Sequence, residues 1–204
     1  MAREEWNRLA PSRDEQRRQK RMAVLQTSAR LFNQFGFERT TLDDIAAELN
    51  VSKRTLYYYV KSKNDILSEC TQLALRHLDR ATRDITASGQ TPLRRIETLL
   101  RRYMSLAADD LGACLILTRP DSLRQENREI LLNGRRKFDY ALRDLIQQGI
   151  DDGSIAPCEP KIAAAAIFGA FNWVLHWHPK RGKEAYDEIT GQFLTFLING
   201  LRAR

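Results

Sequence analysis

The chain has 204 residues, of which 43% are hydrophobic, enough for a packed core and too many for a disordered chain. The length suggests one small domain joined to a larger one. The formal net charge is +7, and residues 1–63 hold 13 Lys and Arg against 8 Asp and Glu. This excess favours a polyanionic partner for the N-terminal part, with a solvated charged face as the ordinary alternative.

Cysteine usage and hydropathy point to a protein of the reducing cytoplasm. Cys70, Cys114 and Cys158 are widely spaced and include no CxxC pair, which argues against a disulfide framework or a zinc site. The first 21 residues are charged where a signal peptide needs an apolar run. The apolar run 162–171 is too short to span a bilayer, so no membrane partner is expected.

The first predicted elements are an arm and a helix. Residues 1–13 have no periodic face and contain a proline, so they are expected to form a flexible basic arm. The helix that follows carries Leu25, Ala29 and Phe32 on one stripe and ends near Gly36. Helical spacing continues almost throughout the chain and no convincing alternation indicates a strand, so the expected fold class is all-α.

Residues 41–59 predict two short helices joined by a tight turn. Thr41 is expected to cap the first helix, with Asp44 in the matching position three residues later. Asn50 tolerates the left-handed conformation that ends this helix, and Ser52 can cap the next one. Such a pair forms a helix-turn-helix, whose second helix can enter a major groove with its N-terminus first. The residues at that leading end are Ser52, Lys53, Arg54 and Thr55.

Three successive tyrosines, Tyr57, Tyr58 and Tyr59, follow on the second short helix. Successive helical residues point about 100° apart, so at least one tyrosine must face outward, where its hydroxyl can donate to a phosphate. Lys63 adds a positive charge at the start of the next helix, beside an N-terminus already suited to phosphate. The alternative is a plain helical hairpin with its tyrosines in the core.

Longer helices fill the rest of the chain. Ser62 and Asp65 repeat the capping pattern and begin a long helix that ends before the break at residues 86–92. Two helices are expected through residues 96–107 and 131–149. The segment 151–160 separates them from two closing helices. The first of these, 161–178, is apolar nearly all round and is therefore expected to be buried on more than one side.

The segment TTLDDIAAELNVSKRTLYYYVKSKNDIL, residues 40–67, resembles the DNA-binding segment of the TetR family of bacterial transcriptional regulators. The resemblance covers roughly residues 21–73, including ARLFNQFGFERTT. Two departures concern packing: Asn50 replaces the usual turn glycine, and Val60 replaces the usual phenylalanine. The implied phosphate contacts are Thr41, Ser52, Tyr58, Tyr59 and Lys63, and the implied groove contacts are Arg54, Thr55 and Tyr57.

The resemblance also implies a division of the chain and a partner for it. It places a helix-turn-helix DNA-binding domain at 14–63 and a larger helical domain for effector binding and dimerisation at 64–204. The last two helices would pair with those of a second chain in a four-helix bundle. The apolar segment 162–177 agrees with this, and Gly169, Gly191 and Gly200 would allow close helix approach. A core within one chain is the alternative.

Several residues of the larger domain are candidates for lining an effector pocket: Tyr103, Phe138, Phe171, Asn172 and Trp173. Asn172 stands out because an amide in an apolar helix needs a partner. Ordinary core packing is the alternative at each position. The segment FNWVLHWHP resembles regulators that sense acyl-CoA thioesters, so the unknown small-molecule effector is expected to be an acyl-CoA or another hydrophobic compound.

Motifs of catalysis and metal binding are absent from the sequence. His176 and His178 are two residues apart and so point to different faces of a helix, and no phosphate-binding glycine loop or nucleophile elbow occurs. We therefore expect no metal, no cofactor and no enzymatic activity. The expected function is a ligand-responsive repressor that binds a palindromic operator on double-stranded DNA as a homodimer. An activator, a ligand-independent regulator and a helical adaptor or enzyme are the alternatives.

Overall fold

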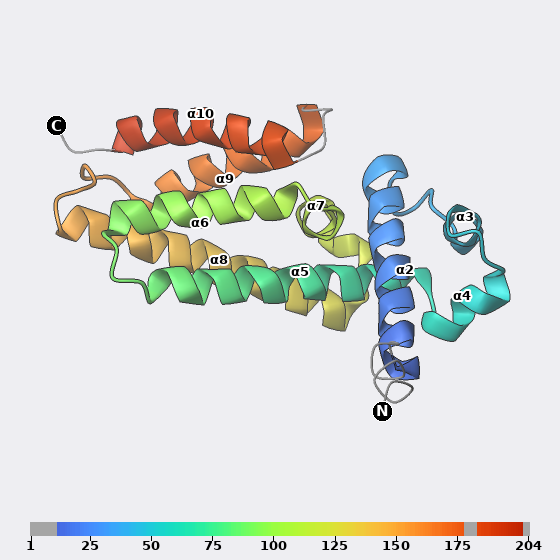
Figure 1. Cartoon of the computed structure of the whole chain (residues 1–204). Coiled ribbons are helices and arrows are strands. Elements are labelled where there is room, and N and C mark those ends of the chain that lie inside the picture. The colour runs from blue at the N-terminus through green and yellow to red at the C-terminus, as the bar shows by residue number, and fades with distance from the viewer. Residues whose placement is uncertain (1–11, 178–182, 202–204) are drawn as a thin grey trace.

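The computed structural model describes residues 12–177 and 183–201, and within these ranges it is all-α, as predicted (Figure 1). Most of the expected arm, residues 1–13, lies outside the described residues, as does His178. The helices are α2 (Arg13–Phe35), α3 (Leu42–Glu48), α4 (Lys53–Tyr59), α5 (Lys63–Thr86), α6 (Pro92–Ala107), α7 (Asp110–Leu117), the 3-10 turn η1 (Pro120–Ser122), α8 (Gln125–Asp151), α9 (Pro160–Trp177) and α10 (Lys183–Leu201).

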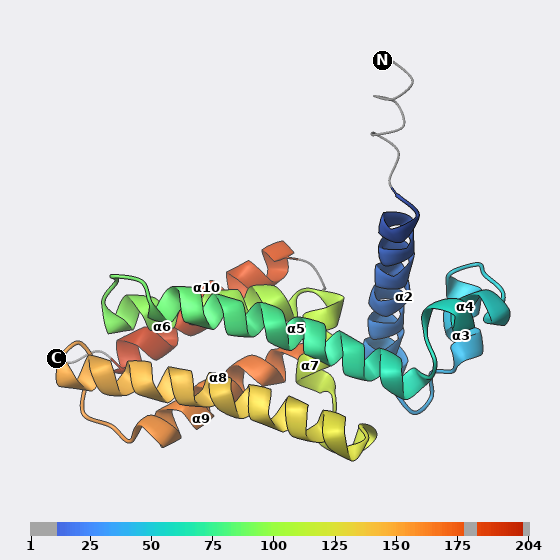
Figure 2. The ribbon, with the colours of Figure 1, turned by 90° about the horizontal axis from the view of Figure 1, so that it is seen from below.

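The helices form two groups that meet at α2 (Figures 1 and 2). At one end of the molecule, α3 and α4 pack on α2. At the other, α5, α6, α8, α9 and α10 run roughly along one direction, and α2 stands across it in both views. Helix α7 lies between the two groups and packs against α2, α5 and α6. Helices α5 and α7 therefore connect the larger group to α2.

The short N-terminal helices begin and end where the sequence predicts. Thr41 and Asp44 form a complete capping box, and hydrogen bonding from the Thr41 side chain lowers the pKa of the Asp44 carboxyl. The Ser52 hydroxyl accepts from the Thr55 amide at 3.1 Å. Asn50 takes φ 53°, so it serves in place of a turn glycine. These caps fix the angle at which α4 leaves the turn.

Helix α7 was missing from the sequence prediction. Its side chain cap, Asp109, accepts from the Leu111 amide at 3.1 Å, and its residues 111–115 are all buried. The helix turns back so closely on α6 that a Cβ at Gly112 would lie 1.9 Å from the carbonyl oxygen of Leu106. Only glycine fits this position without a backbone shift.

Helix α9 is buried on one face only within the single chain, contrary to the expectation of burial on more than one side. Its buried face carries Ala164, Ile167, Phe171 and Val174. The opposite face is exposed, with Trp173 at 62% of its full accessible area. The apolar residues that the sequence assigned to a second buried side therefore form a surface.

Candidate nucleic-acid interface and effector cavity

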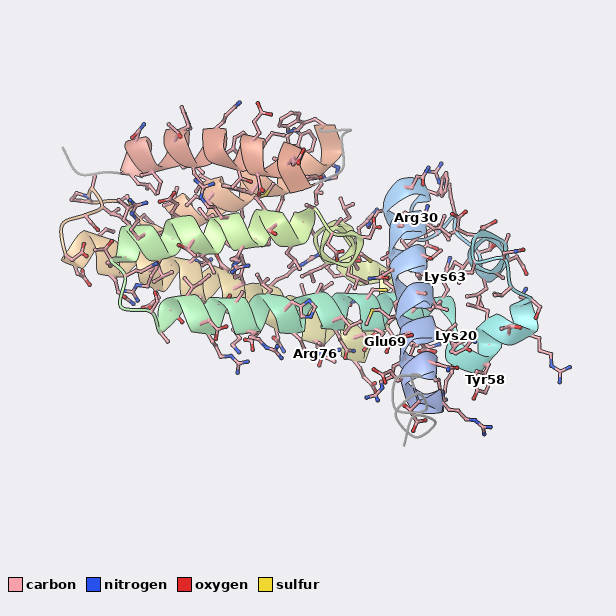
Figure 3. All side chains as sticks on the ribbon, in the orientation of Figure 1. Lys20, Arg30, Tyr58, Lys63, Glu69 and Arg76 are labelled. Carbon is pink, nitrogen blue, oxygen red and sulfur yellow. The ribbon has the colours of Figure 1, made fainter. Side chains whose placement is uncertain are left out.

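Helix α4 presents free side chains at the end of the molecule farthest from the bundle (Figure 3). Arg54 is exposed, and its guanidinium makes no hydrogen bond or ion pair to any described residue. Tyr57 and Tyr58 are 50% and 64% exposed, whereas Tyr59 is half-buried against the core. The prediction that at least one tyrosine faces outward is confirmed. These three exposed side chains are available to a partner without any internal hydrogen bond or ion pair being broken.

The other hydroxyl groups of the predicted interface already hold the local structure together. Ser52 Oγ lies 2.8 Å from Thr55 Oγ1 and also caps α4. The Thr41 hydroxyl donates to the Asp44 carboxylate at 2.7 Å. Lys53 forms an exposed ion pair of 2.8 Å with Asp43 of α3. A phosphate contact from these residues would share or replace an existing bond.

Lys63 is tied to the loop that follows α2. Its ammonium donates to the carbonyl oxygens of Phe37 at 2.7 Å and Glu38 at 3.2 Å, and it lies 4.4 Å from the centre of the Phe37 ring. An ammonium has three hydrogens, so one remains for a phosphate. Removing Lys63 would therefore also release the loop. This role could not be predicted from residue types, because both acceptors are backbone atoms.

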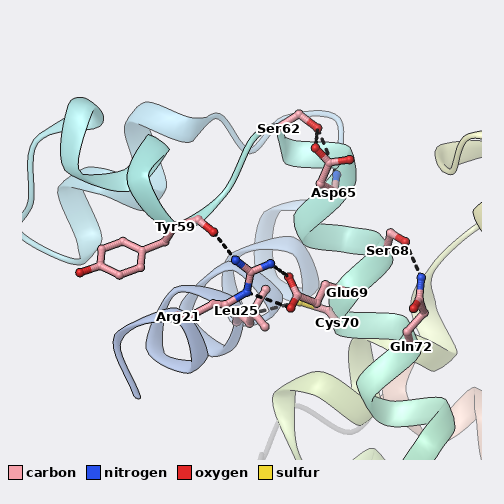
Figure 4. A network of polar contacts seen from close by, with 9 residues as sticks. All are labelled: Arg21, Leu25, Tyr59, Ser62, Asp65, Ser68, Glu69, Cys70 and Gln72. Carbon is pink, nitrogen blue, oxygen red and sulfur yellow. Dashed lines mark hydrogen bonds and ion pairs between the residues drawn. The ribbon is translucent and has the colours of Figure 1, made fainter. Parts of the chain in front are cut away.

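Arg21 joins α2 to the end of α4 and to α5 (Figure 4). Its Nε and Nη2 donate to the two carboxylate oxygens of Glu69 at 3.0 and 2.7 Å, and its Nη1 donates to the Tyr59 carbonyl at 2.6 Å. Hydrogen bonding to Glu69 raises the pKa of Arg21. This contact supports the end of α4, where Val60 offers less volume than a phenylalanine; Val60 itself is buried.

The first turns of α2 add basic residues that the sequence analysis did not assign to the interface. Arg17, Arg18 and Lys20 are exposed, and the guanidinium of Arg17 lies 5.2 Å from the centre of the Tyr58 ring. Figure 3 labels Lys20 on α2 and Tyr58 on α4 at the same end of the molecule. The charge run RDEQRRQKR was visible in the sequence, but its position beside α4 was not.

The larger group of helices encloses a cavity of about 340 Å³, within the size range of small-molecule sites. Three of the five predicted pocket residues line it: Tyr103, Phe138 and Asn172. The Tyr103 hydroxyl donates to Asn172 Oδ1 at 2.5 Å, and its ring stacks on Phe138 with centroids 5.0 Å apart. Burial raises the pKa of Tyr103, so its phenol stays a neutral donor.

The other two predicted pocket residues, Phe171 and Trp173, do not line this cavity. Phe171 is fully buried and packs edge-on against Phe193 of α10. Trp173 faces outward and contacts His176. Phe168 takes the expected place, since it lies one helical turn before Asn172 and so on the same face. Helical spacing from Asn172 would have identified it.

Arg135 is a further cavity residue that the sequence analysis missed. Its Nη2 lies 2.5 Å from the carbonyl oxygen of Leu115, 3.2 Å from that of Ile116 and 2.9 Å from that of Thr118. These carbonyls belong to the last turn of α7, where a helix leaves acceptors without partners. Burial lowers the pKa of Arg135. The side chain thus joins the cavity wall to the end of α7.

An apolar surface runs over α9 and α10. Ile162, Trp173 and Phe196 are 65%, 62% and 81% exposed, and a groove of about 740 Å³ separates the two helices. A Cβ added at Gly169 or Gly191 would meet nothing within 4 Å, so the space above them is open in the single chain. Surfaces of this kind are typical of protein contacts.

Other classes of site are not found in the described part of the chain. No group of three or more metal-ligating side chains occurs there. None of the helices in these ranges has the length and apolarity needed to cross a bilayer.

Comparisons with known proteins cover both groups of helices. The family described as "Bacterial regulatory proteins, tetR family" matches residues 24–70, and "Tetracyclin repressor-like, C-terminal domain" matches residues 89–201. The "Fatty acid metabolism regulator protein" of Bacillus subtilis (strain 168) is 24% identical over 196 residues, covering 91% of this chain and 97% of that protein.

Two solved structures share the fold. The ketosteroid transcriptional regulator KstR2 of Mycobacterium tuberculosis superposes with a TM-score of 0.84 at 21% identity, over 91% of this chain and 96% of that one. AibR in complex with isovaleryl coenzyme A and operator DNA superposes with a TM-score of 0.76 at 22% identity, over 87% of this chain and 97% of that one. With both of its segments matched and its helix-turn-helix in place, the chain belongs to the TetR family of bacterial regulatory proteins and is a DNA-binding transcriptional regulator.

Proposed function

We propose that the chain is a homodimeric, effector-responsive repressor without enzymatic activity, acting in the cytoplasm. The observation that carries the proposal is the free, outward-facing Arg54 at the leading end of a capped helix. Two copies of α4, related by a dimer axis, would enter successive major grooves of a near-palindromic operator. The division into an arm at 1–13, a DNA-binding domain at 14–63 and a larger domain at 64–204 is part of this proposal.

The DNA contacts fall into two kinds in this proposal. Arg54, with Thr55 and Tyr57, reads base edges, because a planar guanidinium pairs with guanine in the major groove. The second kind of contact positions the helix on the phosphates, and its residues are Tyr58, Tyr59, Lys63, Thr41, Ser52 and Lys53. Arg17 joins this second kind, since it is exposed beside Tyr58.

Replacing Arg54 by alanine should change sequence preference as well as affinity. We expect a loss of roughly 1–3 kcal/mol on the operator and relaxed preference at one base pair of each half-site. Tyr58→Phe is the matched control on the same helix, because it removes one neutral hydroxyl and should weaken all sequences alike. Binding to operator and scrambled duplexes at several salt concentrations measures both. An Arg54→Ala protein that keeps its full preference would assign base reading to another residue.

The cavity is the proposed effector site, and its apolar walls suit an acyl compound. Leu78, Leu115, Ile116, Phe138 and Phe168 supply these walls. The size supports the acyl part of a CoA thioester or a free acid, and one relative carries fatty acid metabolism in its name. Release from DNA requires that the effector bind the DNA-competent and incompetent states with different affinity.

Phe138→Leu should shift the effector response more than it changes operator affinity. The change keeps most of the volume but removes ring contacts to Tyr103 and Phe168, so we expect about a tenfold higher effector concentration for half-release. Phe171→Leu is the control, since Phe171 is equally aromatic and buried but lies off the cavity. Operator binding titrated with effector measures the shift. Equal effects of both variants would identify Phe138 as ordinary core.

A further inference from the structure

Two residues of the cavity wall, Asn172 and Arg135, have hydrogen-bond donors without partners. Asn172 uses its Oδ1 for Tyr103, which leaves its amide nitrogen without a partner among the described residues. Arg135 uses only Nη2, so its Nε and Nη1 are likewise unused. None of these three nitrogens is a fully buried, unsatisfied atom, so all remain accessible. A ligand group that contacts these nitrogens has to supply acceptors.

The positive charge of Arg135 in the cavity wall has no counter-ion among the described residues. Arg135 is bonded to neutral carbonyl groups alone, and no carboxylate of the described chain pairs with it. Asp139 lines the same cavity, but Arg143 pairs with both of its oxygens. A partly buried cation without a counter-ion favours an anionic ligand.

The geometry of the Arg135 guanidinium limits how a carboxylate can form two hydrogen bonds with it. A two-bond contact uses either Nε with Nη2 or Nη1 with Nη2, so Nη2 takes part in both arrangements. Arg21 shows the first arrangement in this protein, with Nε and Nη2 on the two oxygens of Glu69. In Arg135, Nη2 has two hydrogens and three carbonyl acceptors around it. A bidentate carboxylate therefore displaces at least one α7 carbonyl.

We propose that the effector is an apolar carboxylic acid whose carboxylate is bound by Arg135 and Asn172, and that it regulates the protein by withdrawing Arg135 from the end of α7. This inference rests on the proposed effector site. An uncharged head group with one acceptor would occupy Nη1 or Nε and leave the α7 carbonyls bound. The carboxylate itself is thus the regulatory feature of the ligand.

Helix α7 is placed to carry the change to the DNA-binding helices. It packs against α2. The side-chain amide of Asn33 on α2 donates to the carbonyl oxygen of Asp110, in the first turn of α7, at 2.9 Å. The last residues of α7, Leu117 and Thr118, share a cavity of about 350 Å³ with Phe32 at the end of α2. This space gives the end of α7 room to move once Arg135 no longer holds its carbonyls.

Binding to the full-length dimer tests the ligand class. Calorimetry with octanoate should show binding that falls about tenfold for octanamide and for Arg135→Lys, because neither the amide nor the lysine can form the charged two-bond contact. Arg101→Gln is the matched control and should bind as wild type, since Arg101 is exposed on α6, pairs with Glu97 and does not line the cavity. Equal binding of octanoate by Arg135→Lys, or of octanamide by wild type, would overturn the proposal. So would the absence of binding for acids of four to twelve carbons.

Hydrogen exchange on the wild-type protein tests the coupling without any variant. Saturating octanoate should speed amide exchange in residues 115–118, whereas octanamide should not. Unchanged exchange in that segment with octanoate bound would refute the withdrawal of Arg135. Octanoyl-CoA distinguishes a thioester ligand from a free acid. If it binds more strongly than octanoate and leaves amide exchange in residues 115–118 unchanged, the thioester is the ligand and the proposal is wrong.

These measurements need no DNA, so they are independent of the repressor proposal. Failure of the wild-type protein to bind any duplex from its own upstream region would overturn the proposed function and leave the ligand result standing. A second outcome separates the two proposals in the other direction. If octanoate releases wild type and Arg135→Lys from the operator equally, the repressor proposal stands, but Arg135 is not the coupling residue.

Discussion

Phe196→Glu should convert the protein from a dimer to a monomer. Phe196 is 81% exposed in the single chain, on the apolar surface of α9 and α10. In a two-fold interface each substitution occurs twice, so two carboxylates would be buried without partners. At about 3 kcal/mol for each uncompensated charge, the dimer would weaken by on the order of 6 kcal/mol, or about four powers of ten.

Light scattering measures this change directly, because the mass should fall to the 23.6 kDa of one chain. Operator binding should fall with it, since a monomer places only one α4 on the DNA. Tyr140→Glu is the matched control: Tyr140 is 56% exposed, but it lies on α8 and does not line the groove between α9 and α10. A wild-type protein that is monomeric at micromolar concentration would contradict the dimer and the two-fold operator with it.

Gly112→Ala should cost the protein much of its stability. The added Cβ would lie 1.9 Å from the Leu106 carbonyl oxygen and 2.5 Å from its carbon, and backbone atoms cannot swing aside as a side chain does. Overpacking of this kind costs about 3 kcal/mol, which for a chain of this size lowers the melting temperature by roughly 6–12 °C. Thermal unfolding followed by circular dichroism measures it.

Gly89→Ala is the control for this substitution. A Cβ at Gly89 meets nothing within 4 Å, and its backbone does not occupy the left-handed region. The melting temperature should stay within about 1 °C of wild type or rise slightly, because alanine restricts the unfolded chain more than glycine does. Equal destabilisation by both variants would mean that α7 does not approach α6 as closely as described.

The sequence predicted the N-terminal helices well because their signals are local. Caps such as Thr41 and Ser52 act within four residues, and the left-handed turn at Asn50 needs only that residue. Helix α7 has one such signal, its cap Asp109, but DLGACLIL is short and almost continuously apolar, so it has no periodic face. Its position depends on contacts with α2, α5 and α6, which no single segment encodes.

The site residues divide along the same line. The exposure of Tyr57 and Tyr58 follows from helical geometry, which the sequence supplies. Lys63 and Arg135 donate hydrogen bonds to backbone carbonyl oxygens that are distant in the sequence. Every residue has such a carbonyl, so residue types do not show which one will be the acceptor. Phe168 was missed in favour of Phe171 because both are apolar, and only the direction of the cavity distinguishes them.

The contact of Arg21 with Glu69 bears on the construction of hybrid regulators. Helix α5 is continuous from Lys63, and its first turns carry Ile66 and Cys70 into the core that α2 also uses. A hybrid cut at the sequence boundary of residue 63 would separate Arg21 from Glu69 and leave α2 facing a foreign helix. A transplanted DNA-binding unit should therefore extend at least through residue 73, and the acceptor protein should contribute an α7 whose surface matches α2.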